Sequence, residues 1–251
     1  MTKRVVSSLR WIIALAMPIF LILSAARILI NDWYPRSEYA RRDFPRDVYG
    51  WTQQERLDLA LPSIHFLNSP LPPDQAVALL AAQRQPASAK PLFTASELSH
   101  MVDVKRLTDA LWRVHVATGI LVVAGLGILL ARPATRRAGY AAATVGGILT
   151  ALFLLFIAFF VVTGFDTFFV IFHEIFFPQG NWTFNYSDSL IRLFPEKFWY
   201  DAGFLIAGGT LGAGILITAA GWLLGRQSAA GSRNTPLLSG AEAAARQNRI
   251  G

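Results

Sequence analysis

The stretch "GYAAATVGGILTALFLLFIAFFVVTG", residues 139–164, contains no charged side chain over its whole length. A helix of about 20 apolar residues is long enough to cross the hydrocarbon core of a membrane. Inside lipid the backbone must pair its own N–H and C=O groups, which a helix does and an irregular chain does not. This stretch therefore predicts a helix that spans a membrane.

Three further runs of the same kind flank it, at residues 11–30, 114–131 and 203–224. The whole chain is 53% hydrophobic and only 16% charged, whereas a soluble domain carries about 25% charged residues. The sequence predicts an all-α membrane protein, a bundle of four transmembrane helices in a single domain of residues 1–225. The tail, residues 226–251, has the composition of a linker and is predicted to lack fixed structure.

The basic side chains predict the orientation in the membrane. Arg and Lys gather at the N-terminal end, between the second and third spans and in the tail, with Glu242 as the only acid among them. Short loops rich in Lys and Arg stay in the cytoplasm. Both termini are therefore predicted inside, with residues 31–113 and 165–202 outside the cell membrane. This bias explains the net charge of +7 through contact with membrane lipid, and no nucleic-acid partner is expected.

The N-terminal run has an alternative interpretation. A basic start, an apolar run and the small residues Ser24, Ala25 and Ala26 resemble a cleavable signal peptide. The apolar run is long for such a peptide and continues to Ile30, which favours an uncleaved first span.

The first outer segment is predicted to mix loops with short helices. Residues 31–50 combine aromatic and charged side chains without a clean period, which predicts loop with short extended pieces. A helix is expected after Thr52 as its N-cap, with Pro62 limiting its length. Another short helix is expected between the Pro-rich breaks of residues 69–91.

A longer helix is predicted to begin near Ala95 and to run into the second span. Thr94, followed three residues later by Glu97, forms a capping-box signature. Glu97, His100 and Asp103 recur every three residues and share roughly one face of this helix. An acid one turn from a histidine can fix its tautomer and raise its basicity, although a solvated helix face has the same pattern.

The second outer segment contains "FHEIFFPQGNWTFNYSDSLIRLFPEKFW", residues 172–199. Aromatic side chains are common at membrane interfaces, which accounts for the rings. An interfacial belt does not account for the polar side chains among them. "PQGN" is a turn signal. A short helix is expected with Ser187 as its N-cap and Pro195 as its stop.

The missing motifs exclude several kinds of chemistry. The chain has no cysteine, which excludes disulfides and thiol nucleophiles. It also lacks the G-x-S-x-G, H-E-x-x-H and Walker patterns. A metal site built from His100 and His173 with Glu97 or Glu174 is an alternative. No spacing requires such a site, and neither a metal nor another cofactor is expected.

Two stretches carry a resemblance to a known family. "LFTASELSHMVDVKRL", residues 92–107, and "FHEIFFPQGNWTFNYSDSLIRLFPEKFWYD", residues 172–201, resemble the signature stretches of the Lit family of bacterial lipoprotein intramolecular transacylases. The similarity covers roughly residues 5–225 and includes the order of the spans. It implies a membrane acyltransferase whose partner is a diacylated lipoprotein, with its active site on the extracytoplasmic side of the cell membrane.

The implied reaction moves the sn-2 acyl chain of the diacylglyceryl group to the α-amino group of the N-terminal cysteine, which gives a lyso-form lipoprotein. The resemblance places the catalytic histidines at His100 and His173. One is expected to act as general base, while the other orients it or stabilises the oxyanion. Because donor and acceptor lie on one substrate, holding them together supplies much of the rate. No enzyme nucleophile is needed, which fits the lack of cysteine.

The remaining polar side chains of the two stretches are candidates for supporting roles. Asp188 and Arg192 are predicted to form a structural pair that shapes the loop. Two alternatives stay open: a non-enzymatic lipid-binding or assembly protein of the membrane, and a metal-dependent membrane hydrolase. The candidates for orienting the histidines or stabilising the oxyanion are Glu97, Asp103, Lys105, Glu174, Asn181, Trp182 and Arg192.

Overall fold

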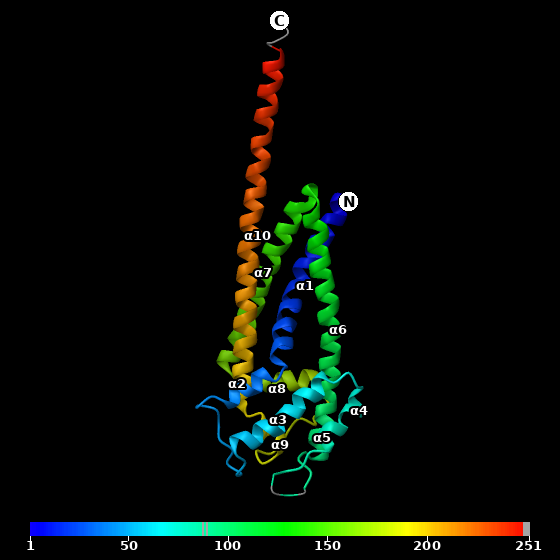
Figure 1. Ribbon diagram of the computed structural model, residues 1–251, viewed down its shortest axis with the longest axis vertical. Helices are drawn as coiled ribbons and strands as arrows, with labels where there is room; N and C mark the ends of the chain where they lie inside the picture. Colours follow the sequence, from blue (N-terminus) through cyan, green and yellow to red (C-terminus); the bar gives the residue numbers. More distant parts are fainter. Residues whose placement is uncertain (87, 89, 248–251) are drawn as a thin grey trace. The chain divides into compact units, whose positions relative to one another are not determined.

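In this computed structural model residues 1–86, 88 and 90–247 are described, apart from the side chains of residues 160–163 and 229–247. The described chain is helical, without a strand, as predicted (Figure 1). Its one isolated β-bridge joins Arg84 to Pro91. The helices are α1 (Lys3–Leu29), α2 (Trp33–Tyr39), α3 (Gln53–Asn68), α4 (Pro73–Ala76), α5 (Ala78–Ala81), α6 (Ala95–Ala131), α7 (Pro133–Thr163), α8 (Phe165–Phe176), α9 (Ser189–Leu193) and α10 (Glu196–Gln247).

Four of these helices are long and apolar enough to cross a membrane, which confirms the predicted four spans. They are Lys3–Leu29, Ala95–Ala131, Pro133–Phe159 and Glu196–Ser228. The orientation of the spans in the membrane stays a prediction.

The chain divides into two compact units, and the single domain predicted for residues 1–225 stays a prediction. Unit 1 comprises Met1–Leu21, Ala117–Phe153 and Leu211–Gly251, and unit 2 comprises Ile22–Val116 and Leu154–Thr210. The divisions fall inside α1, α6, α7 and α10, so four long helices contribute to both units. The histidines named above belong to unit 2.

Unit 1 packs the apolar parts of α1, α6, α7 and α10. Its buried core includes Ile13, Met17 and Leu129. Glycine lets α7 and α10 approach closely, since a Cβ added at Gly147 would lie 2.5 Å from the carbonyl oxygen of Gly214. Small residues allow such close backbone contact between membrane helices, where apolar burial gives little driving force.

In unit 2 the predicted extended pieces of residues 31–50 are wrong in part, because α2 forms there. The hydroxyl of Tyr34 donates to the carbonyl oxygen of Phe198 (2.5 Å), and that of Tyr39 donates to the carbonyl oxygen of Leu193 (2.6 Å). Both tyrosines are buried. The helix is therefore held by contacts with residues more than 150 positions away, which no local pattern reveals.

The predicted capping at the start of α3 is confirmed. The Thr52 hydroxyl accepts from the backbone N–H of Glu55 (3.2 Å), whose carboxylate accepts from the backbone N–H of Thr52 (2.7 Å). Pro62 does not end this helix, contrary to expectation, since α3 continues to Asn68. Proline removes only one helical hydrogen bond, and the buried side chain of Phe66 anchors the turn that follows it.

The third apolar run ends as two helices. α7 stops at Thr163, Gly164 separates the two, and α8 carries His173 (Figure 1). α8 has no buried residue and exposes Ile175 and Phe176 along with other large apolar side chains. This apolar surface fits an interfacial position, because large rings favour the boundary between lipid and water.

The end of the second outer segment forms α9 and the start of α10. The N-cap of α9 is Asp188, one residue later than the predicted Ser187, and the helix ends before Pro195 as expected. α10 then continues to Gln247, whereas the sequence predicts no fixed structure from residue 226 onward. Residues 248–251 of that tail lie outside the described part of the chain.

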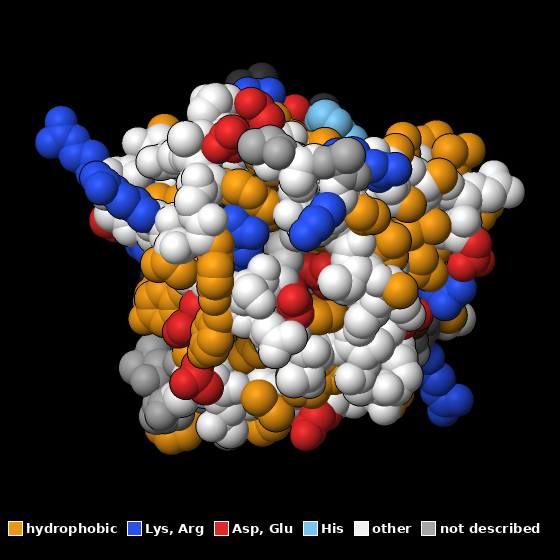
Figure 2. All heavy atoms as spheres, turned by 90° about the horizontal axis from the view of Figure 1, so that it is seen from below, with side chains coloured by type: hydrophobic (Ala, Val, Ile, Leu, Met, Phe, Trp, Pro, Cys, Tyr) orange, Lys and Arg blue, Asp and Glu red, His pale blue; other side chains and the backbone are white. Residues whose placement is uncertain are grey.

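The surface of the molecule seen in Figure 2 mixes acidic, basic and hydrophobic side chains, and no single charge dominates it. Protein surfaces in contact with water usually carry charges of both signs.

Candidate active site

His100 and His173 lie close together, although 73 positions separate them in the sequence. Their ring centroids are 6.0 Å apart and the ring planes make an angle of 28°. His100 projects from the first turns of α6, and His173 from the last turns of α8. His100 is only 7% exposed, whereas His173 is half-buried.

Aromatic side chains surround both imidazoles. His100 meets Phe177 and Phe184 edge to face, with centroid distances of 4.9 and 5.5 Å. His173 lies against Phe169 at 4.0 Å and against Trp182 at 5.0 Å. These residues form what is called the histidine site below: His100, His173, Phe169, Phe177, Trp182 and Phe184.

The tautomer of His173 follows from its hydrogen bond. Nδ1 of His173 lies 2.8 Å from the backbone carbonyl oxygen of Phe169. A carbonyl oxygen only accepts, so Nδ1 carries the proton, and the neutral ring keeps its lone pair on Nε2. Burial lowers the pKa of His173 below the ordinary 6.5 and outweighs the opposing effect of this hydrogen bond. At neutral pH Nε2 is thus an acceptor for a proton.

Glu97 fixes the backbone on which His100 sits. The predicted capping box is confirmed: Thr94 N–H donates to Glu97 Oε2 (2.7 Å), and Glu97 N–H donates to Thr94 Oγ1 (3.2 Å). Glu97 Oε1 accepts from the backbone N–H of Leu190 (2.7 Å), which ties the start of α6 to the start of α9. Because both carboxylate oxygens serve backbone groups, Glu97 supports the site without orienting either imidazole.

Asp103 holds the turn after α8 onto α6. Its Oδ2 accepts from Gln179 Nε2 (2.7 Å) and from Asn181 Nδ2 (2.8 Å), while Oδ1 accepts from Arg106 Nη1 (3.1 Å). Gly180, between the two amides, has a φ of 72°, a left-handed conformation that favours glycine. The predicted "PQGN" turn therefore brings two amides to one carboxylate oxygen. Sequence reasoning missed Gln179, for which this turn signal was the available clue.

Two buried polar atoms of the site have no hydrogen-bond partner among the residues that the structure describes: Nδ1 of His100 and Oδ1 of Asn181. The Asn181 side chain lies next to the His100 ring with its oxygen toward that ring, although no hydrogen bond of regular geometry joins them. Its amide nitrogen is engaged, since Nδ2 also donates to Ser99 Oγ (3.2 Å). Asn181 is consequently no free donor for an oxyanion, one of the roles considered for it.

Two predicted candidates lie apart from the pair. Lys105 is fully buried, and its Nζ donates to the carbonyl oxygen of Ser69 (2.8 Å) and to Asp109 Oδ1 (3.2 Å). It therefore fastens the end of α3 to α6. Glu174 is exposed although it follows His173 directly. Trp182, by contrast, lies against the His173 ring, with the two ring planes tilted by 40°.

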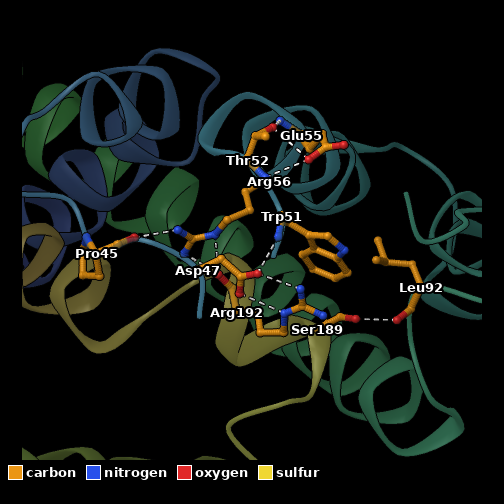
Figure 3. A network of polar contacts seen from close by, with 9 residues as sticks. All are labelled: Pro45, Asp47, Trp51, Thr52, Glu55, Arg56, Leu92, Ser189 and Arg192. Carbon is orange, nitrogen blue, oxygen red and sulfur yellow. Dashed lines mark hydrogen bonds and ion pairs between the residues drawn. The ribbon is translucent and has the colours of Figure 1, made fainter. Parts of the chain in front are cut away.

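The predicted pair of Asp188 and Arg192 is wrong. Arg192 binds Asp47 with two hydrogen bonds, Nη2 to Oδ2 at 2.8 Å and Nε to Oδ1 at 3.0 Å, and its guanidinium lies 3.2 Å from the ring centre of Trp51 (Figure 3). The side chain of Asp188 instead accepts from the backbone N–H of Asn185 (2.8 Å). Two hydrogen bonds to one carboxylate and contact with an aromatic ring stabilise a guanidinium more strongly than an acid that is merely close in sequence, such as Asp188.

Arg56 completes this arrangement from α3. It donates to the backbone carbonyl oxygens of Pro45 (2.6 Å) and Arg192 (2.9 Å) (Figure 3). Burial acts to raise the pKa of Asp47. The hydrogen bonds from Arg192 and from the backbone N–H of Trp51, together with the charges of Arg192 and Arg56, outweigh burial and hold that pKa below the ordinary value. Sequence reasoning missed Asp47 and Arg56. Together with Arg192 and Trp51 they form what is called the arginine network below.

The donor set for a metal is weak. Within the described part of the chain, no three His, Asp or Glu side chains gather in a way that could hold a metal ion. The alternative of a metal site paired the two histidines with Glu97 or Glu174. Glu97 is hydrogen-bonded to the backbone of Leu190, and Glu174 is exposed. The residues present do not fit a metal centre at the histidine pair.

The fold and the site define a class: an all-helical integral membrane protein with two neighbouring histidines, one buried and one half-buried, enclosed by aromatic rings. Residues 11–199 match the family model described as lipoprotein intramolecular transacylase Lit, and the chain belongs to this family. Membership makes the chain an acyltransferase and confirms the expected activity, intramolecular transacylation of lipoproteins.

Similar structures and sequences agree with this assignment. The crystal structure of the lipoprotein intramolecular transacylase Lit from Bacillus cereus matches with a TM-score of 0.70 and 22% identity, over 92% of this chain and 99% of the other. A variant of that protein with one histidine replaced by alanine matches with a TM-score of 0.65 and 20% identity, over 92% and 96%. An uncharacterized protein of Aquifex aeolicus (strain VF5) is 31% identical over 216 residues, 86% of this chain and 94% of the relative.

Proposed function

We propose that the histidine site moves the sn-2 acyl chain of a diacylated lipoprotein from its glyceryl oxygen to the α-amino nitrogen of the N-terminal cysteine. The reaction takes place at the extracytoplasmic side of the cell membrane. The observation that carries the proposal is the neutral His173 with Nε2 free for a proton, 6.0 Å from a second imidazole inside a ring of aromatic side chains. Family membership supplies the class of reaction.

His173 acts as the general base. The free α-amine attacks the carbonyl carbon of the sn-2 ester, and Nε2 of His173 takes a proton from the attacking nitrogen. When the tetrahedral intermediate collapses, the bond from carbon to the glyceryl oxygen breaks, and the same imidazole returns the proton to that oxygen. One C–N bond forms and one C–O bond breaks, so the product is an isomer of the substrate.

The oxyanion of the intermediate needs hydrogen-bond donors. Of the predicted donors, Lys105, Arg192 and Asn181 are engaged with other partners. The remaining ones are the ring N–H groups of His100 and Trp182, both next to His173. We assign the main part to His100, which is the more deeply buried of the two, because a donor acts more strongly where water is excluded.

The aromatic rings have two effects on the reaction. Rings 4.0 to 5.5 Å from the imidazoles leave little room for water beside them, which favours attack by the amine over hydrolysis of the ester. They also offer an apolar wall to acyl chains that enter from the membrane. Since amine and ester belong to one molecule, confinement brings them together with little further loss of entropy.

The test is made in cells whose lipoproteins are otherwise diacylated. The wild type, His100→Ala and His173→Ala are expressed, and the N-terminal lipopeptide is fragmented in a mass spectrometer to locate the acyl chain, since total mass does not change. We expect N-acylation with the wild type and a loss of about a hundredfold or more in each variant. His65→Ala is the matched control, because His65 is exposed and paired with Asp32 (3.0 Å).

Persistent N-acylation in both well-expressed variants would refute the assignment of the pair. Silent histidine variants together with sensitive aromatic variants would support the lipid-binding alternative instead.

A further inference from the structure

Asn181 presents an oxygen to the histidine site for a chemical reason. Its amide nitrogen has two N–H groups, and both are used, one by Asp103 Oδ2 (2.8 Å) and one by Ser99 Oγ (3.2 Å). An ionised carboxylate only accepts hydrogen bonds. Turning the amide over would set its oxygen against the oxygen of Asp103, so the observed orientation is the favourable one.

The remaining edge of the amide is therefore an acceptor, and no described residue donates a hydrogen bond of regular geometry to it. Oδ1 of Asn181 is buried without a partner among the described residues. A buried acceptor that has lost water and gained no donor is unfavourable in the free protein. Such an atom gains most from a ligand that brings an N–H or O–H group to it.

The place of this oxygen indicates which donor arrives. The side-chain oxygen of Asn181 lies toward the His100 ring, and the following residue, Trp182, lies against His173. Two consecutive residues therefore contact both imidazoles. Both oxygens of Asp103 are occupied by Arg106, Gln179 and Asn181. An amine that enters the site therefore meets Nε2 of His173 and, beside the His100 ring, Oδ1 of Asn181, which accepts no hydrogen bond of regular geometry from a described residue.

We infer that Oδ1 of Asn181 accepts a hydrogen bond from the attacking α-amino group, and that Asp103 is the positioning residue that keeps the amide in this orientation. The inference rests on the proposed function and adds the residue that recognises the amine. The negative charge of Asp103 behind the amide polarises it and strengthens its oxygen as an acceptor. With one N–H held by Asn181, the nitrogen can turn another toward Nε2 of His173.

The experiment measures binding rather than turnover. Two synthetic lipopeptides carry ether-linked chains, which cannot be transferred: one has a free α-amine, and in the other hydrogen replaces that amine. Labelled forms of both are titrated against the purified full-length protein in detergent. We expect the wild type to prefer the amine, and Asn181→Leu to reduce this preference about tenfold, as loss of a hydrogen bond to a charged donor does.

Matched controls separate recognition from anchoring of the turn. Gln179→Leu removes the other amide from the same oxygen of Asp103 but leaves Oδ1 of Asn181 in place, so the preference for the amine should persist. Asn185→Leu changes the same residue type in the same loop, where Asn185 serves Asp188, and should also leave the preference unchanged. Asp103→Asn lets the Asn181 amide turn over with little change in shape, so it should reduce the preference for the amine. It provides a second test of the inference if Asn181→Leu does not fold.

The outcomes are distinct. An unchanged preference in folded Asn181→Leu, or an equal loss in Gln179→Leu, overturns the inference while the proposed function stands. A wild type that binds neither lipopeptide overturns both. Loss of preference in Asn181→Leu and Asp103→Asn, with both control variants like the wild type, establishes the role.

Discussion

The histidine site and the arginine network make opposite use of polar groups within unit 2. Both join the second outer segment to earlier parts of the chain, and both set charged or titratable groups against aromatic rings. In the network, the oxygens of Asp47 are taken by Arg192 and by the backbone N–H of Trp51 (2.8 Å). In the histidine site, His100 Nδ1 and Asn181 Oδ1 are buried without partners among the described residues.

The difference separates groups that hold the fold from groups with unsatisfied hydrogen-bonding capacity, which we propose contact the substrate. A buried polar atom without a partner destabilises a protein by about 1–3 kcal/mol, so one kept at a site is a candidate for function. A satisfied, bidentate pair has nothing left to offer a ligand. The same residue types in one loop thus serve two purposes, and hydrogen-bond satisfaction distinguishes them.

Breaking the arginine network should have the largest effect on stability. Arg192→Ala leaves Asp47, whose side chain is 2% exposed, as a buried carboxylate without its cation. We expect a loss of about 3–5 kcal/mol in the free energy of unfolding, measured by denaturant titration of tryptophan fluorescence in detergent.

Arg36→Ala is the matched control, because Arg36 and Asp32 are 57% and 41% exposed and 3.8 Å apart. An exposed pair of this kind contributes less than about 1 kcal/mol. Equal losses in the two variants would contradict the distinction between the network and an ordinary surface pair.

A smaller effect, dependent on pH, is expected at Glu38, a buried carboxyl on α2. Burial and a hydrogen bond with Asp201 raise the pKa of Glu38 from 4.5 to about 7, although Arg41 lies 3.9 Å away. The folded protein therefore keeps a proton that the unfolded chain releases between these values, and stability falls as pH rises from 4.5 to 7. Glu38→Gln removes this dependence. The difference in the free energy of unfolding, variant minus wild type, should therefore be roughly 1–3 kcal/mol larger at pH 8.5 than at pH 5.

The comparison of unfolding curves at the two pH values uses Glu196→Gln as control, since Glu196 is exposed at the start of α10. If both variants shift alike, Glu38 is not the group responsible.

The smallest effect is expected at Glu174, the direct neighbour of His173. Its side chain is exposed, and exposed surface substitutions away from a site usually change little. Glu174→Gln should retain transacylation within about twofold in the lipopeptide assay. A loss of activity comparable to that of His173→Ala would place Glu174 in the site. It would contradict the expectation that Glu174 has no role in the reaction although it follows His173 in the sequence.

Local signals predicted a good part of the fold. The capping boxes at Thr52 and Thr94 were confirmed because each depends on residues three positions apart. α2 was missed because its tyrosines are held by Leu193 and Phe198 from the other outer segment. Arg192 was given the wrong acid for the same reason, since its partner lies 145 positions away.

The sequence by itself determined that this is a membrane protein with four helical spans, because continuous apolar runs of sufficient length have no other favourable state in lipid. Its two signature stretches also indicated the Lit family and the residues His100 and His173. Only the tertiary structure decided the tautomer of His173, the commitment of Asp103 to two amides and the open oxygen of Asn181. These features depend on the distance and direction of atoms from distant segments, and hydrogen bonds are too short-ranged and directional to be read from spacing along a chain.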